Sequence, residues 1–425
     1  MGNNAHFEPP RGMRDFYPEA VAARNALFDA WTQSSRLFGF SQYDACVVES
    51  LELLKRKRGD EIVEQIYAFK DKSNRDLALR PEMTPTLARL IAARQGQLAF
   101  PLKWFAIAQC FRYERMSRGR KREHYQWNLD VVGETALAAE VEVLACAAHA
   151  LRELGLGSGD YKIHINSRAL LADLLTHSGV APAFHPATFL ALDKRGKQED
   201  ADTLRALKAA ALDDNAIAAV FRIMGLQSLE EVRQLFGGEQ PALTALQTLF
   251  QLLAEYGLGD IAWFDIGIVR GLDYYTGIVF EAFDAERQFR AIFGGGRYDN
   301  LLSDLGGAPM TAVGLGFGDV VIAELLAEKG RLVAQQTKLD YAIGYMDDSQ
   351  RSAALRLAQA IRRTGQSVDV ALHAEKPKQF FARAGKGAFQ KAIYVGPDDV
   401  ARGTVRIKNL DERTEEERSL TELLG

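Results

Sequence analysis

The spacing of hydrophobic and polar residues divides the chain into stretches of different character. The clearest element is the first helix, where Val21, Leu27 and Trp31 recur at helical spacing between Pro18 and Gly39. A proline in the first turn and a glycine after the last are typical helix boundaries. Up to about residue 165, β-branched and aromatic residues among polar ones predict strands. We expect strands at 40–49, 77–79, 104–115, 125–133 and 161–165, with helices at 81–95 and 141–154.

The pattern changes twice after this α+β stretch. From about 169 to 256, an Ala/Leu-rich helical periodicity predicts an insertion made of helices. Strands are then expected at 261–269 and 278–283, a glycine turn at 294–296 and a helix at 320–328. From Lys338 onward, strands alternate with helices, which indicates a small parallel α/β domain. We therefore predict a first domain at 1–332, which contains the insertion, and a second domain at 338–425.

Composition and charge limit the class of protein. The 425 residues include 52 Lys and Arg against 56 Asp and Glu, so the net charge is −4. This balance argues against a protein that coats nucleic acid with a basic surface, but it is compatible with a local basic patch. Cys46, Cys110 and Cys146 are too widely spaced for a disulfide framework or a zinc site. No apolar run reaches the roughly 18 residues of a membrane span, and no signal-peptide pattern is present. We expect a soluble, cytoplasmic protein without a membrane partner.

The densest group of charges lies at 111–122, where six basic side chains accompany one acidic side chain. A solvated surface loop explains such a run about as well as a contact with polyphosphate or nucleic acid, for which guanidinium groups are suited. Arg112 and Glu114 are two residues apart in a predicted strand, so they share one face. On that face, Arg112 can hold a phosphate while Glu114 accepts a hydrogen bond from an amine.

Two other segments place charged and aromatic residues beside predicted strands. Arg270 ends a strand and precedes Tyr274 and Tyr275, and the segment 80–84 (Arg-Pro-Glu-Met-Thr) precedes a helix. Taken singly, a surface turn and an ordinary helix start explain these segments better than a binding site does.

Several common site types are excluded or disfavoured. The glycines at 294–296 are not followed by the Lys-Ser/Thr of a P-loop, and those at 314–318 lack the βαβ context of a dinucleotide fingerprint. The His and Cys residues form no metal-ligand pattern, so no metal site is predicted. A Gly-x-Ser-x-Gly elbow for acyl transfer is also missing.

Taken in order, these segments resemble the motifs of the histidyl-tRNA synthetases, which are class II aminoacyl-tRNA synthetases. The sequence Arg-Gly-Leu-Asp-Tyr-Tyr at 270–275 resembles the family's histidine-binding motif and is close to diagnostic. Less specific matches lie at 10–16, 79–84, 111–130 and 295–299. The resemblance extends from about Arg11 into the C-terminal domain.

The resemblance implies a fold, an activity and partners. The expected fold is α+β, with an antiparallel six-stranded catalytic sheet flanked by helices, the helical insertion, and an α/β anticodon-binding domain. The expected protein is a homodimer. It would activate L-histidine with ATP and Mg²⁺ to histidyl-adenylate, then transfer the histidyl group to the 3′ end of tRNA(His).

The resemblance also assigns residues to the two substrates. In the histidine site, Glu82, Thr84 and Gln126 would hold the α-amino group, and Asp130 with Tyr274 and Tyr275 would read the imidazole. Arg270 would bridge the histidine carboxylate and the α-phosphate.

The expected ATP site lies beside the histidine site. Arg112 would grip the α-phosphate and also belong to the histidine-binding residues, so Arg112 and Arg270 are the expected catalytic residues. Glu114 would contact the adenine amine. Arg120 and Arg122 would meet the outer phosphates or the tRNA acceptor end.

Two positions depart from the family pattern. Cys46 stands where the first class motif usually has a proline at the dimer interface. The third motif normally ends Gly-x-Glu-Arg, with the Arg stacked over adenine, but no Arg follows Gly314 until Arg331. Phe317 is a candidate to cover the adenine instead.

Two alternatives share this fold. One is a histidine-sensing paralogue that acts as the regulatory subunit of an ATP phosphoribosyltransferase. That type typically lacks the tRNA-binding domain and an intact second histidine motif, whereas this chain has both. The other is a non-catalytic tRNA-binding or kinase-regulating module, which rests only on the missing third-motif Arg. The ligase is the favoured interpretation.

Overall fold

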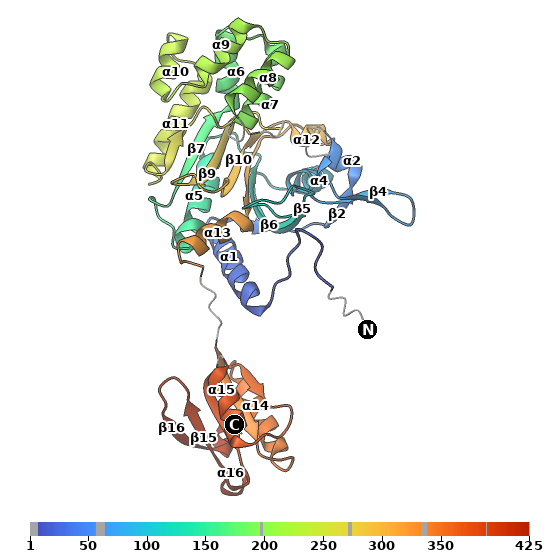
Figure 1. Ribbon diagram of the computed structural model, residues 1–425, viewed down its shortest axis with the longest axis vertical. Coiled ribbons are helices and arrows are strands. Elements are labelled where there is room, and N and C mark those ends of the chain that lie inside the picture. Colours follow the sequence, from blue (N-terminus) through green and yellow to red (C-terminus); the bar gives the residue numbers. More distant parts are fainter. Residues whose placement is uncertain are drawn as a thin grey trace. The chain divides into compact units, whose positions relative to one another are not determined.

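The computed structural model describes residues 7–56, 64–195, 199–270, 274–332, 338–387 and 389–424. The chain divides into two compact units, Met1–Val333 and Ala334–Gly425, and each is described separately below (Figure 1). Among the described residues, none of the helices combines the length and the apolar character that crossing a membrane requires.

An eight-stranded sheet forms the centre of the first unit, in the order β1-β5-β6-β11-β10-β9-β7-β8. The six central strands pair antiparallel, as the resemblance implied, whereas the edge strands β1 and β8 pair parallel with their neighbours. The strands are β1 (Ser41–Gln42), β5 (Leu102–Phe111), β6 (Glu123–Val132), β7 (Tyr161–Ser167), β8 (Ala262–Phe264), β9 (Ile278–Asp284), β10 (Phe293–Tyr298) and β11 (Ala312–Gly318).

Helices α1 (Pro18–Leu37), α5 (Ala138–Glu153) and α13 (Asp319–Glu328) pack against this sheet. An aromatic core joins α1 to the strands: the Trp31 ring lies 5.9 Å from Trp127 and 5.2 Å from Phe317, which lies 5.4 Å from Phe293. Phe317 is fully buried there. The expectation that Phe317 covers the adenine is therefore wrong, since its side chain points into the core rather than into a pocket.

A second, three-stranded sheet has the order β2-β4-β3. Only the two ends of the strand expected at 40–49 are strands. Between them, the carbonyl of Ala45 accepts a hydrogen bond from Arg80 Nη1 at 2.9 Å. The elements near this sheet are β2 (Val48–Ser50), α2 (Leu51–Lys55), β3 (Ala68–Lys70), β4 (Asp76–Leu79), α4 (Thr84–Arg94), η1 (Gln95–Gln97) and α12 (Leu301–Asp304).

Between β7 and β8 the chain forms a group of helices that gathers beyond one end of the large sheet (Figure 1). The side chains of Ser167, Asp213 and Ser228 accept backbone hydrogen bonds at the starts of three of them, as N-cap residues do. The helices are α6 (Arg168–His177), η2 (Pro182–Phe184), α7 (His185–Arg195), α8 (Asp200–Ala209), α9 (Asp214–Ile223), α10 (Leu229–Phe236) and α11 (Pro241–Glu255).

The second unit contains a five-stranded sheet in the order β13-β12-β14-β15-β16. The first three strands are parallel as predicted, but β15 and β16 add an antiparallel edge. Strand β16 has the sequence Glu-Glu-Glu-Arg-Ser and is mostly exposed. It therefore lacks the apolar alternation by which a strand is predicted from sequence. The elements are β12 (Leu339–Tyr345), α14 (Arg351–Arg363), β13 (Val368–Val370), α15 (Pro377–Lys386), β14 (Phe389–Val395), α16 (Pro397–Arg402), β15 (Thr404–Asn409), β16 (Glu415–Ser419) and α17 (Leu420–Leu424).

Candidate active site

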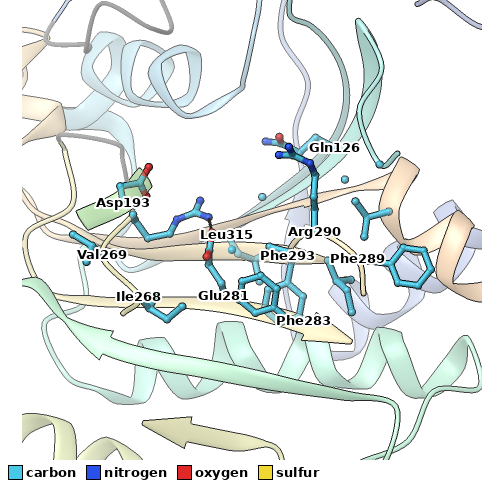
Figure 2. Close-up of a pocket in the computed structure, with 18 of the residues that line it drawn as sticks. Gln126, Asp193, Ile268, Val269, Glu281, Phe283, Phe289, Arg290, Phe293 and Leu315 are labelled. Atoms are coloured by element: carbon cyan, nitrogen blue, oxygen red, sulfur yellow. Dashed lines mark hydrogen bonds and ion pairs between the residues drawn. The ribbon is translucent and has the colours of Figure 1, made fainter. Parts of the chain in front are cut away.

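A cavity of about 1030 Å³ opens over the large sheet of the first unit. Such a volume suits a nucleotide together with an amino acid. Its walls come from β6, β9, β10, β11, the 112–121 loop, the start of α4 and the segment after β8. Figure 2 shows Asp193 of α7, Glu281 of β9 and Arg290 of the β9–β10 connection around this pocket. Segments far apart in sequence therefore meet at one place.

Strand β6 supplies one complete row of polar side chains. Its alternate residues His124, Gln126, Asn128 and Asp130 all line the cavity, because every second residue of a strand faces the same side. The Gln126 amide donates to Asn128 Oδ1 at 2.8 Å and lies 3.4 Å from His124 Nε2. Two of the predicted histidine-binding residues, Gln126 and Asp130, belong to this row.

The glycines of β10 and β11 form a flat floor under these side chains. A Cβ on Gly316 would lie 2.8 Å from the Gln126 amide nitrogen, and one on Gly294 would lie 2.3 Å from Arg270 Nη1. The prediction of a turn at 294–296 is wrong, since these residues are paired on both sides within β10. Glycine is used here because the sheet must approach functional side chains closely, not because the chain reverses.

Asp130 is buried and has one oxygen without a partner. The Tyr298 hydroxyl donates to its Oδ1 at 2.7 Å, whereas Oδ2 has no hydrogen bond to any described residue. Burial raises the pKa of Asp130 to about 7, although the bond from Tyr298 opposes this rise. Burial and Asp130 together raise the pKa of Tyr298 well above its usual value, so the hydroxyl keeps its proton and donates. A buried acceptor without a partner is suited to bind a hydrogen-bond donor of a ligand.

Glu82, Thr84 and the tyrosine pair lie on the neighbouring wall of the cavity. The Tyr274 hydroxyl donates to Glu82 Oε2 at 3.1 Å, and the Tyr274 and Tyr275 rings are 4.8 Å apart. The six residues expected to bind the histidine amino group and imidazole therefore line one cavity; they are Glu82, Thr84, Gln126, Asp130, Tyr274 and Tyr275.

Arg270 enters the cavity from a strained backbone position. Its φ of 58° is in the left-handed region, which is unfavourable for a residue with a side chain and is often found at functional sites. Its guanidinium hydrogen-bonds Glu281, while its Nε has no partner among the described residues. Burial alone would lower the pKa of Arg270, but Glu281 and Tyr275 outweigh burial and raise that pKa, so the group stays cationic. The next three motif residues, 271–273, lie outside the described residues.

Arg112 and Arg120 surround a single carboxylate. Arg112 donates from Nε to the Pro81 carbonyl at 2.9 Å and lies 3.8 Å from Glu114, and Arg120 Nε lies 2.8 Å from the other Glu114 oxygen. All three residues line the cavity. Because Glu114 carries one negative charge between two guanidiniums, the group leaves positive charge for an anionic ligand.

Arg122 lies elsewhere. Its guanidinium is 3.8 Å from the centre of the exposed Tyr113 ring and donates to the Arg11 carbonyl, and it is not among the described residues that line the cavity. Arg118 lines the cavity but pairs with Glu324 and Glu328 of α13. The 111–122 run is therefore divided, with part of it facing the cavity and part of it stabilising neighbouring segments.

Several side chains at this site have no role predicted from the sequence, among them Tyr298, Glu281 and Arg290. Tyr298 lies in a matched motif, but its hydrogen bond to Asp130 is not predicted by that motif. Glu281 and Arg290 belong to no motif, and only the pairing of β9 with β10 brings them to the cavity. The described residues contain no group of three or more His, Cys, Asp or Glu side chains able to hold a metal ion.

Comparisons with known proteins show which families the chain matches. A family model described as histidyl-tRNA synthetase matches residues 12–318, and one described as an anticodon binding domain matches 333–425. A histidine–tRNA ligase of Arabidopsis thaliana, described as chloroplastic/mitochondrial, is 40% identical over 95% of this chain and 83% of its own length. One from Opitutus terrae is 40% identical over 97% and 95%.

Solved structures share the fold. A histidyl-tRNA synthetase from Nostoc aligns with a TM-score of 0.78 and 22% identity over 99% of both chains. A Bacillus halodurans protein described as an ATP phosphoribosyltransferase regulatory subunit/histidyl-tRNA synthetase aligns with a TM-score of 0.74 and 24% identity over 93% of this chain and 100% of its own.

Proposed function

The chain belongs to the histidyl-tRNA synthetase family, and from this premise we propose that it acts as a histidine–tRNA ligase through the cavity over its large sheet. The observation that carries the proposal is the meeting of Arg112 and Arg270 with the half-satisfied carboxylate of Asp130 in one cavity. Two cations beside a selective acceptor suit a reaction between an anionic nucleotide and an amino acid with a polar side chain.

Histidine selection rests on Asp130 and the tyrosine pair. The free Oδ2 of Asp130 accepts from an imidazole N–H, while Tyr274 and Tyr275 enclose the ring. Glu82, Thr84 and Gln126 hold the α-amino group. An amino acid without a ring N–H would leave the buried Asp130 oxygen unpaired, which costs roughly 1–3 kcal/mol.

In activation, an oxygen of the histidine carboxylate attacks the α-phosphorus of ATP. The bond from that phosphorus to the bridging β-oxygen breaks, and pyrophosphate leaves. Arg270 contacts the carboxylate and the α-phosphate, and Arg112 contacts the α-phosphate, so both offset the charge that builds on the phosphoryl oxygens. Holding the two anions in line removes much of the entropic barrier.

Around the nucleotide, Glu114 meets the adenine amine and Arg120 serves the outer phosphates. Arg122, which lies outside the cavity, is left for the tRNA acceptor end. Mg²⁺ enters with ATP as part of the substrate, bound chiefly by phosphate oxygens.

In transfer, a hydroxyl of the 3′-terminal ribose of tRNA(His) attacks the acyl carbon of the adenylate, and AMP leaves. The domain at 338–425 binds the anticodon. The match of 333–425 to an anticodon-binding model supports this role. Base contacts there would select the tRNA, and phosphate contacts would position it.

The active form is a homodimer in the cytoplasm. Exposed apolar side chains around the first class motif support the dimer: Val47 and Val48 are each 39% exposed and Phe69 is 44% exposed. Apolar groups gathered in this way commonly mark an interface. Cys46 lies exposed beside them and takes the place of the usual proline. Three free cysteines fit a reducing compartment.

The regulatory-subunit alternative is not favoured. The curated relatives are histidine–tRNA ligases over nearly the whole chain, and the anticodon-binding region is present.

Histidine-dependent exchange between ATP and labelled pyrophosphate tests the proposal. Purified protein should catalyse the exchange with histidine but not with glutamine or phenylalanine. If histidine binds and no exchange occurs, the ligase assignment fails and the sensing paralogue becomes the better description.

A further inference from the structure

The third class motif of this chain has no charged side chain where its arginine is expected. Counting Gly-x-Glu-Arg from Gly318 places Val320 and Val321 at the last two positions, and both are buried. The cavity nevertheless extends over this region, because Gly318, Val320 and Val321 line it. A nucleotide at this end would meet an apolar surface from α13.

Arg290 lies beside the position left without an arginine. A Cβ built on Gly119 would lie 3.2 Å from Val321 Cγ2 and 3.6 Å from Arg290 Cδ, so the two side chains lie against the same small residue. Arg290 comes from the β9–β10 connection rather than from α13. Figure 2 shows its side chain extending away from the strands, and Arg290 lines the cavity.

The nearby guanidinium groups have acidic partners, whereas that of Arg290 has none among the described residues. Arg118 pairs with Glu324 and Glu328, and Arg120 pairs with Glu114. Within the described part of the chain, Arg290 has neither an ion pair nor a hydrogen bond. Burial and repulsion from Arg120 lower the pKa of Arg290, although Glu114 acts in the other direction. A guanidinium held in this way gains from any ligand that presents an anion or a π-face.

An uncharged ring lies at the same end of the cavity. Gly318 pairs with Gln126, which places the start of α13 near the first residues of β6, including His124. Burial and Arg112 lower the pKa of His124 to about 3, so its imidazole is neutral. A neutral ring and a planar cation are the two surfaces on which a purine stacks.

We propose that Arg290 replaces the missing third-motif arginine and stacks on the adenine of ATP. The proposal rests on the function proposed above and adds a residue that no motif contains. The guanidinium that the family's motif supplies from α13 comes here from the β9–β10 connection. It occupies the same region of the cavity.

The test compares four variants by ATP–pyrophosphate exchange and by calorimetry of Mg·ATP binding. Arg290→Ala should raise the KM for ATP about 10- to 30-fold, with unchanged histidine affinity. Arg290→Lys should recover only part of the loss, because a lysine keeps the charge without the planar group. The double variant Arg290→Ala/Val321→Arg should regain ATP affinity, because it returns the guanidinium to the third motif.

Arg331→Ala is the matched control. Arg331 is the first arginine after the third motif, pairs with Asp160, and is not among the described residues lining the cavity, so its loss should not change the KM for ATP. An unchanged KM in Arg290→Ala overturns the proposal, and full activity in Arg290→Lys overturns stacking. If wild-type protein shows no exchange, the proposed function fails, but ATP affinity from calorimetry still decides whether Arg290 binds the nucleotide.

Discussion

Gly314 and Asp130 are register partners on neighbouring strands, and the Asp130 carboxylate occupies the space that a side chain on Gly314 would need. A Cβ built on Gly314 would lie 1.9 Å from Asp130 Oδ1. Asp130 cannot retreat easily, because it is buried and bonded to Tyr298. The position of the proposed imidazole acceptor therefore depends on the absence of one methyl group on the next strand.

Gly314→Ala should accordingly weaken histidine binding by at least about 10-fold, since one displaced hydrogen bond to a charged group is worth about 1.5–3 kcal/mol. Calorimetric titration with histidine measures this change. Gly318→Ala is the control, because no atom lies within 4 Å of a Cβ there and its φ of −83° suits alanine. Equal histidine affinity in the two variants would contradict the proposed pocket.

Arg270→Ala should reduce kcat for ATP–pyrophosphate exchange by about 100- to 1000-fold, because a preorganised donor to transition-state charge is lost. Glu281→Gln should cost much less, since it removes only the carboxylate that orients Arg270. Single-turnover adenylate formation measures both. Exchange at near-wild-type rate in Arg270→Ala is incompatible with a catalytic role for this residue.

Asp130→Asn should change how stability depends on pH. Because burial raises the pKa of folded Asp130 from 3.8 to about 7, the folded state binds a proton that the unfolded chain has already released between these values. Stability of the wild type should then fall as pH rises from 4 to 7, by up to about 4 kcal/mol relative to the Asn variant.

Urea unfolding followed by tryptophan fluorescence measures this difference. All four tryptophans lie in the first unit, so their emission reports on the catalytic domain alone. A constant difference between the two proteins across this pH range would show that Asp130 is not a buried acid.

Deleting residues from Lys338 onward should leave histidine activation within a few-fold of wild type but reduce the charging of tRNA(His) by orders of magnitude. The reason is that the cavity residues all belong to the first unit. Exchange and aminoacylation assays on the same preparation separate the two steps. Complete charging by the shortened protein would remove the anticodon-binding assignment.

The sequence predicts the strands that show apolar alternation and the site residues that lie within motifs. Gln126 and Asp130 are predicted because a family motif covers them, whereas His124 and Asn128, which lie in the same row of β6, are not predicted. The prediction is wrong where a residue type serves an uncommon purpose. The glycines at 294–296 resemble a turn, whereas Gly294 makes room for Arg270 and the next two glycines make room for the backbones of β11 and β9. Strand β16 was missed because its charged residues pair at a solvent-exposed edge.

The role of Arg290 also cannot be predicted from the local sequence. Nothing near it in the sequence distinguishes it from other surface arginines. The role proposed for Arg290 depends on its position beside Val321. The two residues come close only after β9, β10 and β11 have paired.

Strand β11 lies between β6 and β10, although it follows both in the chain. The large sheet therefore stays in two halves during synthesis until residues 312–318 have emerged from the ribosome and joined them. Pairings over such long sequence separations form slowly. A nascent chain that stops before this strand would have Arg112 and Asp130 on one half and Arg270 and Arg290 on the other. The ability to bind ATP would then report that folding of the catalytic domain is complete.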